Sequence, residues 1–269
     1  MVVSVAALQF PVGVPLGLED LLYLFRRKPD FICLPEYFAV RRDAESHRDG
    51  TDSIRQQLDF YSQVSRDLQC VLIGGTIAHP AEGGFANIAT VFDSGEPVGF
   101  YQKMNPTDHE KRRGIIPGDE YKTFDVRGLR IGVLICADVL TGDSFAAMAE
   151  MGADMIFAPT VSPYRTGDTV FAKQKRDQEI FVAGARRASA YVVKTCGIGT
   201  IFGGRLQGRS GIFAPWGILK NVTPDSEDKK LVLTEALDIA EIREFAGQVR
   251  TLSEREAPSP ALIAQQSHS

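Results

Sequence analysis

Short apolar runs recur along the whole chain, and their length limits the fold more than any other feature. Each run has about five to eight residues, is rich in valine and isoleucine, and is bounded by Gly, Pro or Asp. Such runs predict β-strands, and none approaches the length of a membrane-spanning helix. The runs are residues 2–8, 31–35, 70–75, 86–92, 129–136, 154–159, 190–195, 210–215 and 231–237.

Amphipathic stretches lie between these runs and predict helices. Apolar residues recur at steps of three and four in residues 51–69, with Thr51 as the candidate cap. Residues 168–189 predict a second long helix, with Asp168 as its candidate cap. Shorter helices are expected at residues 17–27 and 143–151.

The order of these elements indicates the fold class. The early part reads strand, helix, strand, helix, strand, which is typical of an α/β sheet with crossover helices. Residues 85–135 are rich in strands with short links, so antiparallel pairing is expected there. No linker or repeat divides the chain, so residues 1–250 are expected to form one domain. Residues 251–269 contain two prolines and few core residues, which predicts an extended arm or a disordered tail.

Composition argues against several classes of protein. The formal net charge of −4 gives no broad basic surface, so nucleic acid is not an expected partner. The opening "MVVSVAALQF" has no basic segment and reads as a first strand, not as a signal peptide. The four cysteines, at positions 33, 70, 136 and 196, form no C-x-x-C pair, which indicates reduced thiols in a cytoplasmic protein without a membrane partner. The four histidines lack the spacing of metal ligands.

Reactive side chains follow several of the apolar runs. Glu36 comes after "FICLP", Cys136 ends "LRIGVLIC", and Thr160 follows "DMIFAP". Lys103 follows another short run, residues 98–101, just before an Asn-Pro turn. Sites in α/β sheets gather at the carboxyl ends of strands. Taken singly, each residue also has a plain structural explanation, since a cysteine at the end of an apolar run is often a core residue.

Three of these motifs together resemble a known family of enzymes. Glu36 in "LPEYF", Lys103 in "YQKMNP" and Cys136 in "GVLICADV" resemble the Glu-Lys-Cys triad of the nitrilase superfamily of carbon–nitrogen hydrolases, in the same order and with the same wide spacing. The segments "VAALQF", "GGFANIATVFDSGEPVGFYQK", "GRSGIFAPWGIL" and "LTEALDIAEIRE" are also similar to that superfamily. The resemblance therefore covers nearly the whole chain.

The resemblance implies a four-layer αββα sandwich of two mixed β-sheets with outer helices, in subunits that pair as a homodimer or a higher homo-oligomer. Two features depart from the superfamily's pattern. Ala137 stands where an aromatic residue often follows the cysteine, and "RRASAYVV" replaces an Arg-Ala-x-Glu-Asn pattern. Both departures concern the shape of the pocket and leave the triad intact.

The resemblance also implies a role for each triad residue. Cys136 would attack the substrate carbonyl and form a thioester, with Glu36 as the general base that takes the thiol proton and later activates water. Lys103 and the backbone N–H of Ala137 would stabilise the oxyanion. This chemistry needs neither a metal nor an organic cofactor.

Glu110 lies seven residues after Lys103 and before Pro117-Gly118, where many members of the superfamily place a second glutamate. We expect it to hold Lys103 charged and to accept a hydrogen bond from the substrate amide. The alternative is a solvated glutamate beside Lys111 and Arg112.

The expected substrate-binding residues follow the strand ends that should surround the cysteine. Arg165 could bind a substrate carboxylate, or it could pair with Asp168. The full set is Tyr37, Ala137, Asp138, Thr160, Ser162, Tyr164 and Arg165.

The expected function is hydrolysis of a small amide or N-carbamoyl compound. The alternatives are a nitrilase and a catalytically silent binding protein. The Ala-Asp pair after the cysteine disfavours the nitrilase, since nitrilases of the superfamily tend to carry Trp-Glu there.

Overall fold

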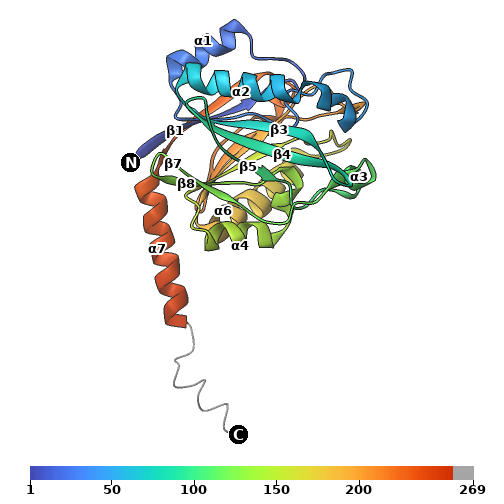
Figure 1. Ribbon diagram of the computed structural model, residues 1–269. Coiled ribbons are helices and arrows are strands. Elements are labelled where there is room, and N and C mark those ends of the chain that lie inside the picture. The colour runs from blue at the N-terminus through green and yellow to red at the C-terminus, as the bar shows by residue number, and fades with distance from the viewer. Residues whose placement is uncertain (257–269) are drawn as a thin grey trace.

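Two β-sheets form the centre of the computed structural model, which describes residues 1–256 (Figure 1). The first sheet has the order β15-β1-β2-β3-β4-β5, with β6 beside β4. Its strands are β1 Val2–Gln9, β2 Phe31–Cys33, β3 Val71–Ala81, β4 Gly84–Asp93, β5 Glu96–Gln102, β6 Ile115–Ile116 and β15 Leu231–Asp238.

The second sheet has the order β14-β13-β10-β9-β8-β7. Its strands are β7 Thr123–Val126, β8 Leu129–Val133, β9 Met155–Thr160, β10 Tyr191–Cys196, β13 Gly211–Ala214 and β14 Gly217–Asn221. A small hairpin, β11 Thr200–Ile201 and β12 Gly204–Arg205, lies outside both sheets.

Both sheets are mixed. Strands β1, β2 and β3 run parallel, as do β8, β9 and β10, because helices cross between them. The pairs β3–β4 and β4–β5 are antiparallel, as expected for residues 85–135, and so is β7–β8. The strand pairing therefore confirms the predicted mixture of crossovers and hairpins.

The structure confirms the four predicted helical stretches and adds two helices, at residues 108–112 and 239–256, that were not predicted. The helices are α1 Leu18–Arg27, α2 Ile54–Leu68, α3 Asp108–Arg112, α4 Gly142–Glu150, α5 Val170–Arg176, α6 Ala183–Ala188 and α7 Ile239–Glu256. A π-helical segment, Asp177–Val182, joins α5 to α6 into the long helix expected at residues 168–189.

Both predicted helix caps were wrong. Thr169, not Asp168, caps α5 by accepting a hydrogen bond from the Ala172 N–H. The Asp168 carboxylate instead binds Arg176, which occupies both of its oxygens. Thr51 lies inside a 3₁₀ turn, His47–Ser53, that precedes α2, so the helix begins three residues later than the pattern suggested.

Three apolar clusters define four layers. The central cluster joins the facing sides of the two sheets and includes Val5 and Ile73 from the first sheet and Phe157 and Val193 from the second. A second cluster packs α1 and α2 on the outer side of the first sheet. A third packs α4 and α6 on the outer side of the second sheet. The chain is thus the αββα sandwich that the resemblance implied.

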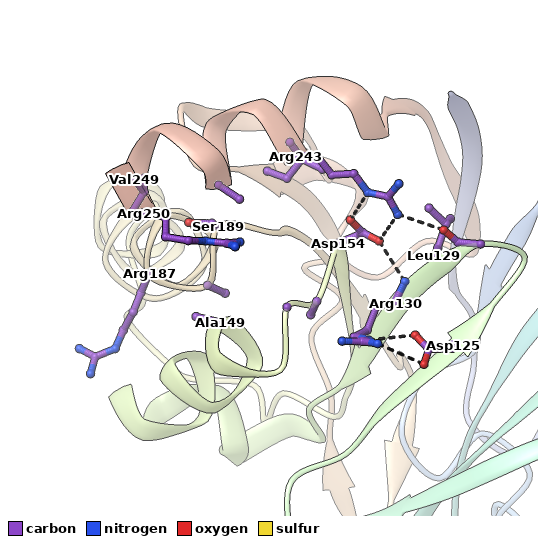
Figure 2. A pocket seen from close by; sticks show the side chains of 16 residues that line it. Asp125, Leu129, Arg130, Ala149, Asp154, Arg187, Ser189, Arg243, Val249 and Arg250 are labelled. Atoms are coloured by element: carbon purple, nitrogen blue, oxygen red, sulfur yellow. Dashed lines mark hydrogen bonds and ion pairs between the residues drawn. The ribbon is translucent and has the colours of Figure 1, made fainter. Parts of the chain in front are cut away.

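Helix α7 leaves the sandwich and projects beyond it (Figure 1). Near its start, Arg243 donates to both carboxylate oxygens of Asp154, each at 2.8 Å, which fixes the helix beside β9 (Figure 2). Residues 251–256 continue this helix and are therefore not the extended or disordered segment that the sequence suggested. The rest of the predicted tail, 257–269, lies outside the described residues.

Within residues 1–256, no helix is both long enough and apolar enough to cross a membrane.

Candidate active site

Cys136 lies on a tight turn that follows β8. The strand ends at Val133, although the apolar run continues to Ile135, and the Leu134 N–H still donates to the Phe157 carbonyl of β9 at 3.0 Å. Cys136 has φ +48°, a left-handed backbone conformation that is costly for a residue with a side chain. It opens a 3₁₀ turn, Cys136–Leu140. The backbone N–H of Ala137 lies in the first turn, where such groups lack an acceptor within the helix and are free for a ligand.

Lys103 lies between two carboxylates. Its Nζ donates to Glu36 Oε1 at 2.9 Å and to Glu110 Oε1 at 2.7 Å. The lysine side chain is 1% exposed, so these are buried ion pairs. Burial lowers the pKa of Lys103, but the charges of Glu36, Cys136 and Glu110 outweigh it and raise that pKa above its ordinary value. Lys103 is therefore a fixed cation.

Glu36 is completely buried and held from two sides. Oε1 accepts a hydrogen bond from Asn87 Nδ2 at 2.9 Å in addition to that from Lys103, and Oε2 accepts one from the Val161 N–H at 3.0 Å. Burial raises the pKa of Glu36, against the opposing effect of Lys103. A raised pKa suits a carboxylate that must accept and return a proton.

Cys136 lies beside Glu36 and Val161. Its Sγ donates to the Val161 carbonyl at 3.4 Å and also interacts with the Glu36 carboxylate. Burial and then the charge of Glu36 raise the pKa of Cys136 well above its ordinary value, although Lys103 lowers it. The resting group is therefore a neutral thiol, which needs a base to become a nucleophile.

Glu110 has a different environment from Glu36. Its Oε2 accepts hydrogen bonds from the backbone N–H and the hydroxyl of Thr107, at 2.8 and 3.0 Å, at the start of α3. Burial favours a higher pKa, but Lys103 and Thr107 outweigh it and lower the pKa of Glu110 below its ordinary value. Glu110 is thus a permanent anion next to Lys103, and the alternative of a solvated surface glutamate is wrong.

Asp138 joins the turn that bears Cys136 to the loop that bears Lys103. One carboxylate oxygen accepts from the Ile135 N–H at 2.9 Å and from the Tyr101 hydroxyl at 2.8 Å. The other accepts from the backbone and side-chain amides of Asn105, at 2.7 and 3.2 Å. The predicted contact of Asp138 with substrate stays a prediction. Asp138 is fully buried, and its two oxygens accept four hydrogen bonds from the protein. It is a positioning residue.

The other predicted pocket residues divide into two groups. Tyr37 and Ala137 are buried next to the triad. Thr160 is also buried, but its hydroxyl donates to the carbonyl of Ala158, and Ser162 is half-buried on the following segment.

Tyr164 and Arg165 are exposed, and the Tyr164 ring lies 4.4 Å from the Arg205 guanidinium. The suggested pairing of Arg165 with Asp168 does not form, because Arg176 occupies that carboxylate.

Two residues that touch Glu36 were missed in the sequence. Asn87 lies on β4 and also reaches Glu110 at 3.5 Å, while Val161 uses only its backbone. A polar residue inside the apolar run "ANIATVF" was a usable signal, because a buried amide needs partners. The backbone of Val161 left no signal in the sequence.

The remaining cysteines are core residues. Cys33, Cys70 and Cys196 are all buried, and burial raises the pKa of Cys33 and of Cys70 to about 12. Cys136, which is half-buried, is the reachable thiol among residues 1–256.

A hollow of about 740 Å³ lies elsewhere, between α7 and the ends of α4 and α6 (Figure 2). None of the residues that line it belongs to the Glu36, Lys103 and Cys136 cluster. The hollow is therefore separate from the predicted triad.

The sequence model of the family described as Carbon-nitrogen hydrolase matches residues 14–246. The chain belongs to the carbon–nitrogen hydrolase family. This membership confirms the resemblance to the nitrilase superfamily, and it supports hydrolysis of carbon–nitrogen bonds as the general chemistry.

The chain is similar to several known proteins. It is 23% identical to human omega-amidase NIT2 over 236 residues, which are 81% of this chain and 80% of that protein. A shorter match, 23% identical over 145 residues, covers 53% of this chain and 27% of the glutamine-dependent NAD(+) synthetase of Acinetobacter baylyi.

Among solved structures, a carbon–nitrogen hydrolase from Helicobacter pylori superposes with a TM-score of 0.79 at 19% identity, covering 95% of this chain and 96% of that one. A mutant of an amidase from Nesterenkonia sp. AN1, with the acetamide moiety of fluoroacetamide bound covalently at its active-site cysteine, superposes with a TM-score of 0.71 at 16% identity, covering 98% of this chain and 96% of that one. These structures share the fold of this chain.

Proposed function

We propose that this protein is a thiol amidase, which hydrolyses the C–N bond of a small amide or N-carbamoyl compound through a thioester on Cys136. One observation carries the proposal: a single buried lysine, Lys103, joins two carboxylates beside a cysteine held on a strained turn. The acetamide adduct from fluoroacetamide on the active-site cysteine of the Nesterenkonia amidase supports a nucleophilic cysteine, and the name omega-amidase given to NIT2 supports an amide substrate.

The first half-reaction forms the thioester. Cys136 Sγ attacks the carbonyl carbon while its proton passes to Glu36, because a thiol with a raised pKa is not ionised beforehand. The carbonyl oxygen becomes an oxyanion that Lys103 Nζ and the Ala137 N–H stabilise. The C–N bond then breaks, Glu36 returns the proton to the leaving nitrogen, and ammonia or an amine departs.

The second half-reaction restores the enzyme. Glu36 takes a proton from a water molecule while the water oxygen attacks the thioester carbon. The C–S bond breaks, the acid is released, and the proton on Glu36 returns to Cys136. Every proton taken up is given back, so the cycle consumes only the amide and one water.

A screen for ammonia release tests this proposal. Amides, N-carbamoyl amino acids and nitriles would be offered to the purified protein, with intact-mass analysis after rapid quenching. We expect hydrolysis of at least one amide or N-carbamoyl compound and an acyl adduct on Cys136. Turnover confined to nitriles would favour the nitrilase alternative, and no turnover of any compound would favour a silent binding protein.

A further inference from the structure

Asn87 is a buried amide on β4 that contacts both carboxylates of the site. Its Nδ2 donates to Glu36 Oε1 at 2.9 Å and makes a longer contact with Glu110 Oε1 at 3.5 Å. Its backbone carbonyl accepts a hydrogen bond from the Lys103 N–H at 2.9 Å, because β4 and β5 are antiparallel neighbours. Asn87 therefore touches the three charged residues that lie beside Cys136.

The alternation of β4 turns this amide toward the space between the sheets. Ala89 and Val91 belong to the central cluster, whereas Ala86 and Ile88 pack under the outer helices. Asn87 is in step with the first pair, so it shares the inner face. Its side chain is 0% exposed, and a buried amide needs polar partners to offset its lost hydration. An apolar residue would fill this position better if packing were its whole role.

The partners of the amide fix its orientation. Both contacts of Nδ2 are to carboxylate oxygens, and an ionised carboxylate can only accept hydrogen bonds. A flipped amide would place Asn87 Oδ1 against Glu36 Oε1, oxygen against oxygen. Within residues 1–256, Oδ1 has no hydrogen-bond partner, so the protein uses the donor end of this side chain.

The two oxygens of Glu36 are occupied unequally. Oε1 accepts from Lys103 Nζ and from Asn87 Nδ2, each at 2.9 Å, and these bonds take up both of its lone pairs. In the described part of the chain, Oε2 accepts a hydrogen bond from the Val161 N–H at 3.0 Å and keeps one lone pair. Cys136 Sγ lies at the same residue, since it donates to the Val161 carbonyl at 3.4 Å. The free lone pair thus belongs to the oxygen whose backbone partner also contacts the thiol.

We propose that Asn87 is a positioning residue: together with Lys103 it holds Glu36 Oε1 and so leaves Oε2 as the atom that takes the Cys136 proton. The proposal rests on the proposed function and assigns the general base to one oxygen of Glu36. Without Nδ2, the carboxylate is free to turn about its last carbon–carbon bond. Its charged form also loses a donor that stabilises it.

Asn87→Leu tests the proposal, since leucine keeps the branched shape but has no donor. We expect kcat to fall by about 10- to 100-fold, because the base is no longer aligned, with KM within about threefold of the wild type. The acidic side of the kcat/KM profile should move to higher pH, because the Glu36 carboxylate has lost a donor. The rate of Cys136 alkylation by iodoacetamide should fall, and its pH profile should move in the same direction.

Thr90→Val is the matched control. It changes another buried side chain of β4, which lies beside Gly74 and Tyr61 on the outer side of the sheet. Turnover, alkylation and both pH profiles should stay as in the wild type.

Each other outcome has a definite meaning. An Asn87→Leu enzyme with wild-type kcat and unmoved pH profiles would overturn the role of Asn87 and leave the amidase proposal intact. Loss of turnover without movement of either profile would show that Asn87 only supports the fold, which would also overturn it. If Asn87→Leu failed to fold, Asn87→Ala, which fits the same space, would decide by the same criteria. A wild type that hydrolyses no amide would refute the proposed function, and the alkylation profile, which needs no substrate, would then decide the role of Asn87.

Discussion

The substitution Asp138→Asn tests how the turn that bears Cys136 is joined to the loop that bears Lys103. The carboxylate accepts four hydrogen bonds, two on each oxygen, from Ile135, Tyr101 and Asn105. An asparagine keeps the shape but has one acceptor oxygen and one NH₂ group. If the Tyr101 hydroxyl rotates or the Asn105 amide flips, one of them can accept a hydrogen bond from the NH₂ group of the new asparagine. One backbone N–H, of Ile135 or Asn105, then still faces a donor.

The expected magnitude follows from that one unsatisfied group. A buried donor left without an acceptor costs about 1–3 kcal/mol, so the free energy of unfolding should fall by about that amount. The loop that bears Lys103 should also shift relative to Cys136, and a misplacement of about 1 Å can reduce the rate by roughly 10²-fold. We therefore expect a folded enzyme with kcat reduced by about two orders of magnitude.

The assay combines urea unfolding, turnover of the best amide from the screen, and the rate of Cys136 alkylation by iodoacetamide. Asp119→Asn makes the same chemical change at an exposed position on a nearby loop and should match the wild type in all three. If Asp138→Asn lowered stability but left kcat and alkylation unchanged, the carboxylate would not be what aligns the two catalytic segments.

The other predictions concern the reacting groups and the assembly. Cys136→Ala should fold normally and show no turnover above a mock preparation, since loss of the nucleophile removes nearly the whole advantage of a cooperating set; retained hydrolysis would rule out the thioester. Burial raises the pKa of Glu36, so the pH at which kcat/KM falls on the acidic side should lie above the ordinary pKa range of a glutamate, with activity lost as the pH falls through that pKa. Glu36→Gln should be inactive at every pH. Glu110→Gln should lower kcat/KM by at least about 10²-fold while Cys136 stays reactive to alkylation, with exposed Glu120→Gln as control; normal kinetics would contradict a role beside Lys103. We also propose a homodimer or larger assembly, which light scattering would contradict by finding only a 29.5 kDa particle at micromolar concentration.

The sequence predicted those parts of the site where a reactive side chain interrupts a regular pattern. Glu36 follows β2 in the first sheet and Cys136 follows the run that contains β8 in the second sheet, and sites in α/β sheets gather at such carboxyl ends of strands. Lys103 could be recognised only together with them, because a lysine after a strand is usually solvated. The periodicity of each segment predicted an α/β sheet with crossover helices, whereas the four layers of the sandwich came from the resemblance to the superfamily.

Other parts of the site depend on pairings between distant segments. Tertiary packing brings the backbone of Val161 to Glu36 and Cys136, although nothing in its own segment marks that contact. Asp138 was assigned to the substrate because it follows one of the strand ends expected to surround the cysteine. Its real partners include Tyr101 and Asn105, more than thirty residues away, and sequence spacing carries no information about them.

The two carboxylates that share Lys103 have opposite roles for a physical reason. Glu110 receives two further hydrogen bonds from Thr107 at a helix start, which stabilise its charged form and keep its pKa low. Glu36 is more deeply buried, and burial penalises its charge enough to raise its pKa despite the same lysine. A single cation thus supports a permanent anion on one side and a proton acceptor on the other. In the proposed mechanism Glu36, the carboxylate with the raised pKa, takes the proton of the neutral Cys136 thiol and returns it, while Glu110 keeps Lys103 charged and in place.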